Sequence, residues 1–153
     1  MAPDGTGKDD GRGLIALLTQ LSKAFNRRST EEMLGMRLKE FLILGLVGER
    51  PGTTQQEIGE TMLMDSNTIV LLLNELESRG FVIRRRDADD RRRHLVEMTA
   101  SGRQALAKAE KGREAIEDEI FAGLTDDERQ TLRMLLLRVL ETQARAAATA
   151  ART

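Results

Sequence analysis

The sequence predicts a mainly α fold with a small β-hairpin wing, which places it in the α+β class. Thr54 and Glu57 have the spacing of a capping box that opens one helix, and Asp65 is a suitable N-cap for a second. The segment from Phe81 to Met98 then has two β-rich stretches around a polar turn. Helix, turn, helix and hairpin predict a winged helix-turn-helix, and apolar helices on both sides predict flanking N- and C-terminal dimerisation helices.

Composition and hydrophobic spacing divide the chain into five segments. Residues 1–13 are rich in Gly, Asp and Lys and predict a disordered tail. Residues 14–35 contain an apolar helical stripe and a connector, which we interpret as an N-terminal dimerisation helix. Residues 36–99 form the predicted winged helix-turn-helix lobe. Residues 100–148 contain two C-terminal helices separated by a glycine break, and residues 149–153 are expected to fray.

The composition argues against several classes of function. The chain has 153 residues with no cysteine and one histidine, so disulfides and thiolate chemistry are excluded and a metal site is not expected. We expect His94 to be an ordinary strand residue. No Ser/His/Asp grouping is present, so the sequence predicts neither an enzyme nor a cofactor. There is no membrane-spanning apolar run and no secretory pattern at the N-terminus, so we expect a cytoplasmic protein without a membrane partner.

The net charge of −1 conceals a separation of charge along the chain. Seven arginines and three aspartates lie between Arg79 and Arg93, a local excess of four positive charges. Eight acidic residues and two basic ones lie between Glu110 and Glu128, and we interpret that run as a solvated face. Attraction to phosphate is a local effect, so the basic hairpin predicts an affinity for nucleic acid despite the net charge.

The helix that follows Asp65 has one apolar face and one free face. Apolar residues recur at i, i+3, i+4 and i+7 from Ile69, which predicts a buried stripe. The opposite face predicts contact with base edges in the DNA major groove, where Asn can pair with adenine. The alternatives are a helix cap and a solvated face, and for Thr54 plain capping. The candidate contacts of this helix and the preceding one are Thr54, Gln55, Ser66, Asn67, Thr68, Val70, Leu71 and Asn74.

The hairpin carries most of the local positive charge. An arginine at its tip predicts entry into the narrow minor groove, with a neighbouring aspartate to orient it. Side chains alternate along a strand, so the arginines at positions 84 to 86 cannot all face DNA, and we expect one or more of them to form salt bridges. The candidate contacts of the wing are Arg84, Arg86, Asp90, Arg91, Arg92 and Arg93.

A series of short motifs follows in order along the chain. The motifs are Gly52-x-Thr54-Gln55-x-Glu57-Ile58-Gly59, Asp65-x-x-Thr68, Leu72, Leu76-Glu77-x-x-Gly80-x-Val82-x-Arg84, Asp90-Arg91-Arg92 and Val96-x-Met98-Thr99-x-x-Gly102. This series resembles the MarR-type transcriptional regulators from about Leu14 to Leu140. By that resemblance, Arg92 enters the minor groove and its neighbouring arginines lie near the backbone. Many members have Arg near position 71 and a basic residue near 75, where this chain has Leu71 and Glu75. Leu71 faces away from the core and could meet a thymine methyl.

The resemblance implies a ligand-responsive repressor that acts as a homodimer on double-stranded DNA. A dimer would place two recognition helices roughly 34 Å apart on a pseudo-palindromic operator. A small-molecule effector could bind between the DNA-binding lobe and the dimer helices. The alternative is a winged-helix protein-interaction module that has lost specific DNA binding. The residues expected at the dimer interface are Leu14, Leu17, Leu18, Leu21, Leu132, Leu135, Leu136, Val139 and Leu140.

Overall fold

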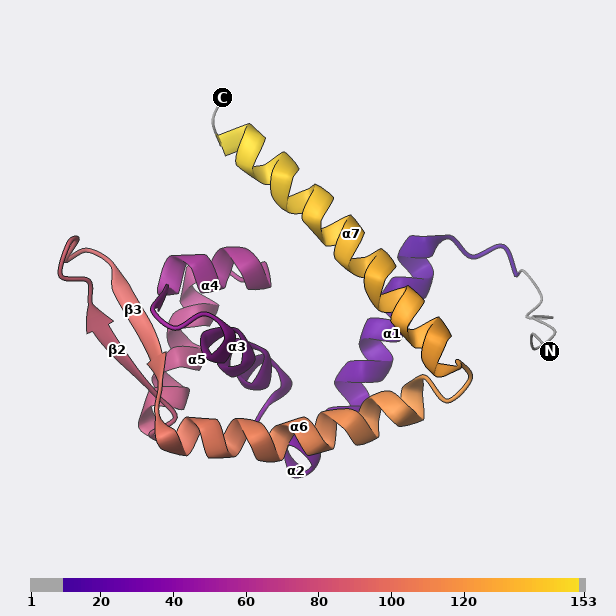
Figure 1. The fold of residues 1–153 in the computed structure, drawn as a ribbon, viewed down its shortest axis with the longest axis horizontal. Coiled ribbons are helices and arrows are strands. Elements are labelled where there is room, and N and C mark those ends of the chain that lie inside the picture. The colour runs from indigo at the N-terminus through magenta and orange to yellow at the C-terminus, as the bar shows by residue number, and fades with distance from the viewer. Residues whose placement is uncertain (1–9, 152–153) are drawn as a thin grey trace. The chain divides into compact units, whose positions relative to one another are not determined.

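The computed structural model describes residues 10–151, so most of the predicted N-terminal tail and the last two residues of the chain lie outside the described part. The chain divides into two compact units, Met1–Ile116 and Glu117–Thr153. The elements in chain order (Figure 1) are α1 (Leu14–Arg28), α2 (Glu31–Leu34), α3 (Leu38–Glu49), β1 (Thr53–Thr54), α4 (Gln55–Met62), α5 (Ser66–Ser78), β2 (Val82–Arg86), β3 (His94–Met98), α6 (Ala100–Ile120) and α7 (Asp126–Ala151). The predicted fold class is confirmed.

The helix-turn-helix consists of α4 and α5, and both begin where the sequence predicts. Thr54 and Glu57 each accept a hydrogen bond from the other's backbone N–H, which completes the capping box. The Asp65 carboxylate accepts from the Thr68 N–H at 2.8 Å and caps α5. Hydrogen bonds from the backbone and then the hydroxyl of Thr68 lower the pKa of Asp65. The turn between the helices passes through Leu63, which is left-handed (φ 53) and 89% exposed.

The wing belongs to a three-stranded antiparallel sheet of order β1-β3-β2. The predicted hairpin of β2 and β3 is present, with Arg84 opposite Val96. The strand β1 was not predicted, and it pairs Thr53 with Val96 on the other edge of β3. This pairing joins the start of α4 to the base of the wing.

The core of the first unit is formed by α3, α5 and the inner face of the sheet. As predicted, the apolar stripe of α5 is buried. Leu42 on α3 is 42% exposed, and the connector after Arg28 contains the short helix α2 (Glu31–Leu34). The side chains that are almost completely buried are Met36, Ile43, Leu44, Val47, Ile58, Ile69, Leu73, Leu76, Val82 and Val96.

Helix α6 begins at the predicted cap and passes close to α2. The Thr99 hydroxyl accepts from the Gly102 N–H at 3.0 Å and donates to the Gly80 carbonyl at 2.6 Å. Gly112, in the middle of α6, lies so close to α2 that a Cβ on it would be 2.1 Å from the Met33 carbonyl oxygen. A glycine is therefore required at position 112 for α6 to pack this close to α2.

The second unit contains the end of α6 and the helix α7. Thr125 and Glu128 form a second capping box, with bonds of 2.9 and 3.2 Å. Arg129 donates to Asp118 Oδ1 at 2.7 Å and so ties α7 to the preceding helix end. Among the residues whose burial is described, α7 has none that is buried, and neither has α1 in the first unit. Among the described residues, no helix combines the length and hydropathy needed to cross a membrane.

Candidate nucleic-acid interface

The free face of α5 is exposed as the helical spacing predicts. Ser66, Asn67 and Asn74 are exposed polar side chains, and Leu71 between them is 65% exposed. No packing within the described part of the chain accounts for a leucine at that position. Thr68 and Val70, which the sequence also suggested as contacts, are half-buried on the flank of the helix.

The wing tip presents its arginines to solvent. Arg92 has a side chain that is 92% exposed, and its Nε donates to Asp90 Oδ1 at 3.2 Å. The Arg92 backbone N–H donates to the same carboxylate oxygen at 3.1 Å. Asp90 therefore orients Arg92 without burying it. Arg91 and Arg93 are exposed beside it, and Arg93 lies 3.7 Å from the Glu57 carboxylate on α4.

The three arginines of β2 have different partners, which confirms that some of them form salt bridges. Arg84 pairs with Glu77 on α5 at 2.6 Å and also donates to Asn74. Arg85 pairs with Glu97 on β3 at 3.3 Å, and Arg86 is exposed. Arg84 differs from Arg86, because its side chain is only 21% exposed and its guanidinium is bound to α5, and its contact with DNA stays a prediction.

Of the two alternatives for Thr54, the structure shows the capping contact, and a DNA contact stays a prediction. Thr54 is buried, and its hydroxyl accepts the Glu57 N–H as part of the capping box. Its position is therefore explained by the start of α4 alone. The neighbouring Gln55 is half-buried and has no such bond to the cap.

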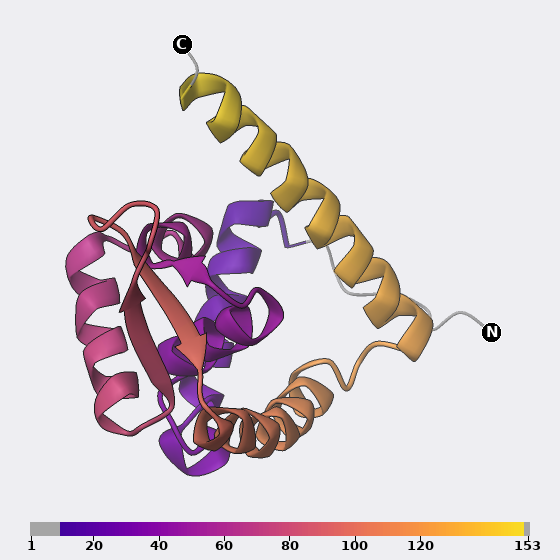
Figure 2. The same cartoon turned by 60° about the vertical axis from the view of Figure 1, so that its left-hand side comes forward.

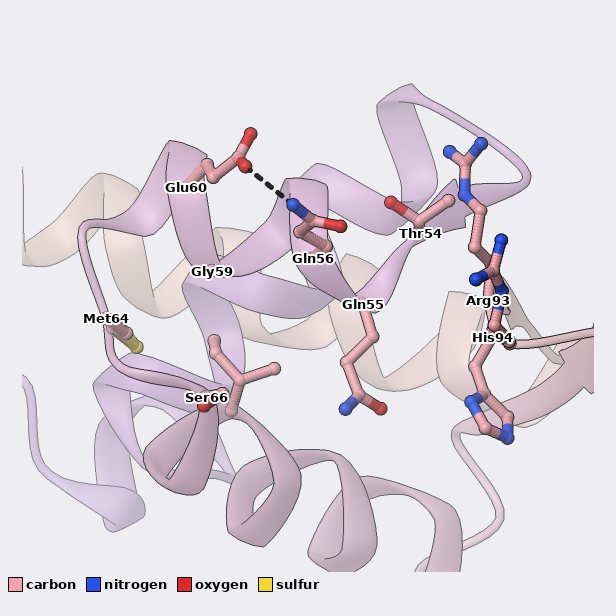
Figure 3. Close-up of a pocket in the computed structure, with 11 residues that line it drawn as sticks. Thr54, Gln55, Gln56, Gly59, Glu60, Met64, Ser66, Arg93 and His94 are labelled. Atoms are coloured by element: carbon pink, nitrogen blue, oxygen red, sulfur yellow. Dashed lines mark hydrogen bonds between the residues drawn. The ribbon is translucent and has the colours of Figure 1, made fainter. Parts of the chain in front are cut away.

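A cavity of about 380 Å³ lies between the starts of α4 and α5 and the wing (Figure 3). In this view the Gln55 side chain lies between Ser66 on one side and His94 on the other. The cavity brings together predicted residues from three elements, and it adds Gln56 and His94, which the sequence did not suggest. Its lining residues are Thr54, Gln55, Gln56, Gly59, Glu60, Met64, Ser66, Ile69, Arg92, Arg93 and His94.

Glu75, one of the two acidic residues on α5, is paired within the lobe. Arg37, at the start of α3, contacts Glu75 through Nη2 and Glu40 through Nε at 3.3 Å. These carboxylates, Glu75 foremost, raise the pKa of Arg37 above its usual value. Arg79 lies 4.0 Å from the buried Glu40 and donates to the Gly35 carbonyl at 2.9 Å. This network joins residues of different elements, so it has no signature in the sequence, and it offsets negative charge on α5.

In the described part of the chain, no cluster of three or more His, Cys, Asp or Glu side chains is arranged to hold a metal ion. The site is instead a surface of polar helix ends, amides and arginines. Such groups bind by hydrogen bonding and charge, and they do not form a catalytic constellation.

Comparison with known proteins decides the family. The model of the MarR family matches residues 34–93. A proposed transcriptional regulatory protein for the hcr operon of Thauera aromatica is 34% identical over 128 residues, which cover 84% of this chain and 74% of that protein. The chain belongs to the MarR family. It is therefore a transcriptional regulator and not an enzyme, and the resemblance found in the sequence is confirmed.

Solved MarR structures share the fold. A crystal structure of MarR superimposes with a TM-score of 0.82 at 27% identity, covering 92% of this chain and 97% of that one. A point mutant of MarR from Escherichia coli, crystallised in complex with operator DNA, gives a TM-score of 0.72 at 25% identity. That comparison covers 83% of this chain and 93% of the MarR chain.

Proposed function

We propose that this MarR-family chain is a sequence-specific DNA-binding protein that acts as a homodimer on a pseudo-palindromic operator. The observation that carries the proposal is the shared concave surface between α5 and the wing. Ser66 at the start of α5, Gln55 at the start of α4 and Arg92 at the wing tip all line it. A MarR mutant from Escherichia coli has been crystallised with operator DNA, and this supports DNA binding as the function of the same fold here.

The dimensions and chemistry of α5 suit the major groove. A groove about 12 Å wide admits an α-helix, and the exposed side chains of α5 offer amide, hydroxyl and apolar contacts to base edges. Leu71 takes the place of a charged contact and would pack against a thymine methyl. We propose Ser66, Asn67, Leu71 and Asn74 as the base-reading residues, with Gln55 on the phosphate backbone.

The wing suits the minor groove beside the helix. Arg92 is extended and oriented by Asp90, so little conformational freedom remains to be lost when it enters a narrow groove of negative potential. Arg86, Arg91 and Arg93 are exposed near it and would contact phosphates. In this proposal Thr54, Thr68, Val70 and Arg84 support the contacting residues and do not touch DNA.

Exposed apolar stripes in both units support a homodimer. In α1 and in α7, leucines at helical spacing face solvent in the single chain, and contiguous exposed apolar surface is typical of an interface. Two-fold association would present two α5 helices to successive major grooves, roughly 34 Å apart. The proposed interface consists of Leu14, Leu17, Leu18, Leu21, Leu132, Leu135, Leu136, Val139 and Leu140.

We further propose that the dimer is a repressor whose DNA affinity responds to a small-molecule effector. An effector changes operator binding only by its difference in affinity for the two lobe arrangements. Repression follows if the occupied operator overlaps a promoter.

The proposal is tested by selection from a random duplex library. Two α5 helices related by a two-fold axis should enrich an inverted repeat whose half-site centres are about 10 base pairs apart. The complex should contain two copies of the chain per duplex by sedimentation. Failure to enrich any motif would contradict sequence-specific binding, and an enriched motif bound by one copy would contradict the dimer.

Leu71→Ala is expected to change base preference more than total affinity. The truncation removes an apolar contact to a thymine methyl but no charge, so one position in each half-site should lose its preference. Leu63→Ala is a matched control, because Leu63 is exposed in the helix-turn-helix turn but lies outside α5. The prediction fails if the motif selected by Leu71→Ala equals that of the unchanged protein.

A further inference from the structure

The Asn74 side chain is held by the strand beside it. Arg84, on β2, donates from Nη2 to Asn74 Oδ1 and from Nε to Glu77 Oε2 at 2.6 Å. A guanidinium has only N–H donors, so the amide atom that faces it must be the oxygen. Arg84 therefore fixes the direction in which the Asn74 amide points.

The Arg84 side chain is itself held in place, so it can fix the orientation of the Asn74 amide. Its side chain is 21% exposed, and it forms an ion pair with Glu77, three residues after Asn74 on the same helix. Helix α5 packs beside β2 (Figure 2), so strand and helix move together. Hydrogen bonds between charged groups are roughly twice as strong as those between neutral ones, so the pair with Glu77 anchors the guanidinium.

We infer that Arg84 is a positioning residue that makes Asn74 a hydrogen-bond donor toward DNA. The inference rests on the proposed function, because it requires the free face of α5 to lie in the major groove. Oδ1 accepts from Arg84, so Asn74 is left with two Nδ2 protons to donate. Bidentate pairing with adenine needs both the amide oxygen and the amide nitrogen, which this arrangement disfavours.

The donor-only amide selects bases with acceptors on the major-groove edge. Guanine presents two acceptors there, N7 and O6, and thymine presents O4, whereas cytosine presents only the N4 donor. Adenine presents one acceptor, N7, beside its N6 donor, so a second Asn74 proton would face another donor. One position of each half-site should therefore be guanine or thymine on the strand that Asn74 contacts. An asparagine without such a partner would be expected to contact adenine. Because Arg84 occupies its amide oxygen, Asn74 is expected to contact guanine or thymine instead.

Arg84→Met tests the inference because it keeps the aliphatic stem and removes the donors. In selection from a random-site library, preference at one position per half-site should move from guanine or thymine toward adenine, on the order of tenfold in relative affinity. Asn74→Ala should abolish preference at that same position. The double variant should select the same motif as Asn74→Ala, since Arg84 acts through Asn74.

Asn74→Asp provides a second test at an exposed position that does not affect the core. The carboxylate has no proton to donate and can accept from the cytosine N4 group, so preference at that position should move to cytosine. Arg85→Met is the control, because it removes the same charge from the next residue, which pairs with Glu97 instead. It should select the motif of the unchanged protein.

A purely structural role for Arg84 predicts weaker binding with an unaltered motif, and that result would overturn the inference. A change at a position other than the one governed by Asn74 would also overturn it. If the unchanged protein selects no motif at all, the proposed function fails and this inference fails with it. A motif that is selected but not shifted by the variants leaves the proposed function standing and removes only the role of Arg84.

Discussion

Arg92→Ala is expected to weaken binding to the selected duplex on the order of a hundredfold, because a dimer loses two minor-groove arginines at once. Arg92 is the most exposed of the arginines whose ion pairs are described, and Asp90 holds its guanidinium at the wing tip. Its removal leaves no buried group unpaired. The loss should therefore appear in DNA affinity and not in folding or dimerisation, as measured by fluorescence anisotropy alongside sedimentation.

Arg85→Ala is the matched control for the wing tip. It removes the same charge from the same hairpin, but Arg85 pairs with Glu97 across the sheet. Its variant should bind DNA within a fewfold of the unchanged protein. If the two variants lose equal affinity, the wing acts as a diffuse charge and not through its tip. If Arg92→Ala binds normally, the wing tip does not contact DNA.

Gly112→Ala is expected to lower the free energy of unfolding by about 1–3 kcal/mol, the usual cost of overpacking a tight contact. The added Cβ would lie 2.1 Å from the Met33 carbonyl oxygen, so α6 and α2 must move apart. Both partners at this contact are backbone, which cannot rotate away as a side chain could. Urea unfolding at a fixed protein concentration measures the change.

Gly45→Ala is expected to raise the free energy of unfolding, in contrast to Gly112→Ala. Gly45 also lies inside a helix, but a Cβ there would meet nothing within 4 Å. Alanine lowers the conformational entropy of the unfolded chain at no steric cost, so stability should rise by about 0.5–1 kcal/mol. Equal destabilisation by both substitutions would show that the close approach of α6 to α2 is not what distinguishes Gly112.

Most helices and strands of the first unit could be predicted because the residues that determine them lie close together in the sequence. A capping box is formed by residues three apart, and a buried helical face recurs every three or four residues. The sequence near Thr54 and Asp65 therefore predicts where their two helices begin. Elements that depend on distant partners were missed. The strand β1 has two residues and exists only because β3 lies beside it. Leu63 occupies a left-handed position where sequence analysis would look for glycine.

The features of the candidate interface fall into the same two groups, those that follow from the local sequence and those that depend on distant partners. Exposure of Leu71 and Asn67 follows from helical spacing, and exposure of Arg92 follows from its place at a hairpin tip. The contacts of Arg84 with Asn74 and of Arg37 with Glu75 join different elements, and only the packed lobe brings them together. These contacts change the chemistry of the predicted surface, because one orients the Asn74 amide and the other offsets a negative charge on α5.

The salt dependence of DNA affinity tests the central claim most directly, because neutralising phosphates releases counterions from the duplex. Arginines presented by two wings should neutralise at least four phosphates. The logarithm of the association constant for the selected duplex should then fall against the logarithm of salt concentration with a slope of about −4 or steeper, at ~0.9 per phosphate. A slope near zero would contradict DNA binding by this surface and favour a protein-interaction module.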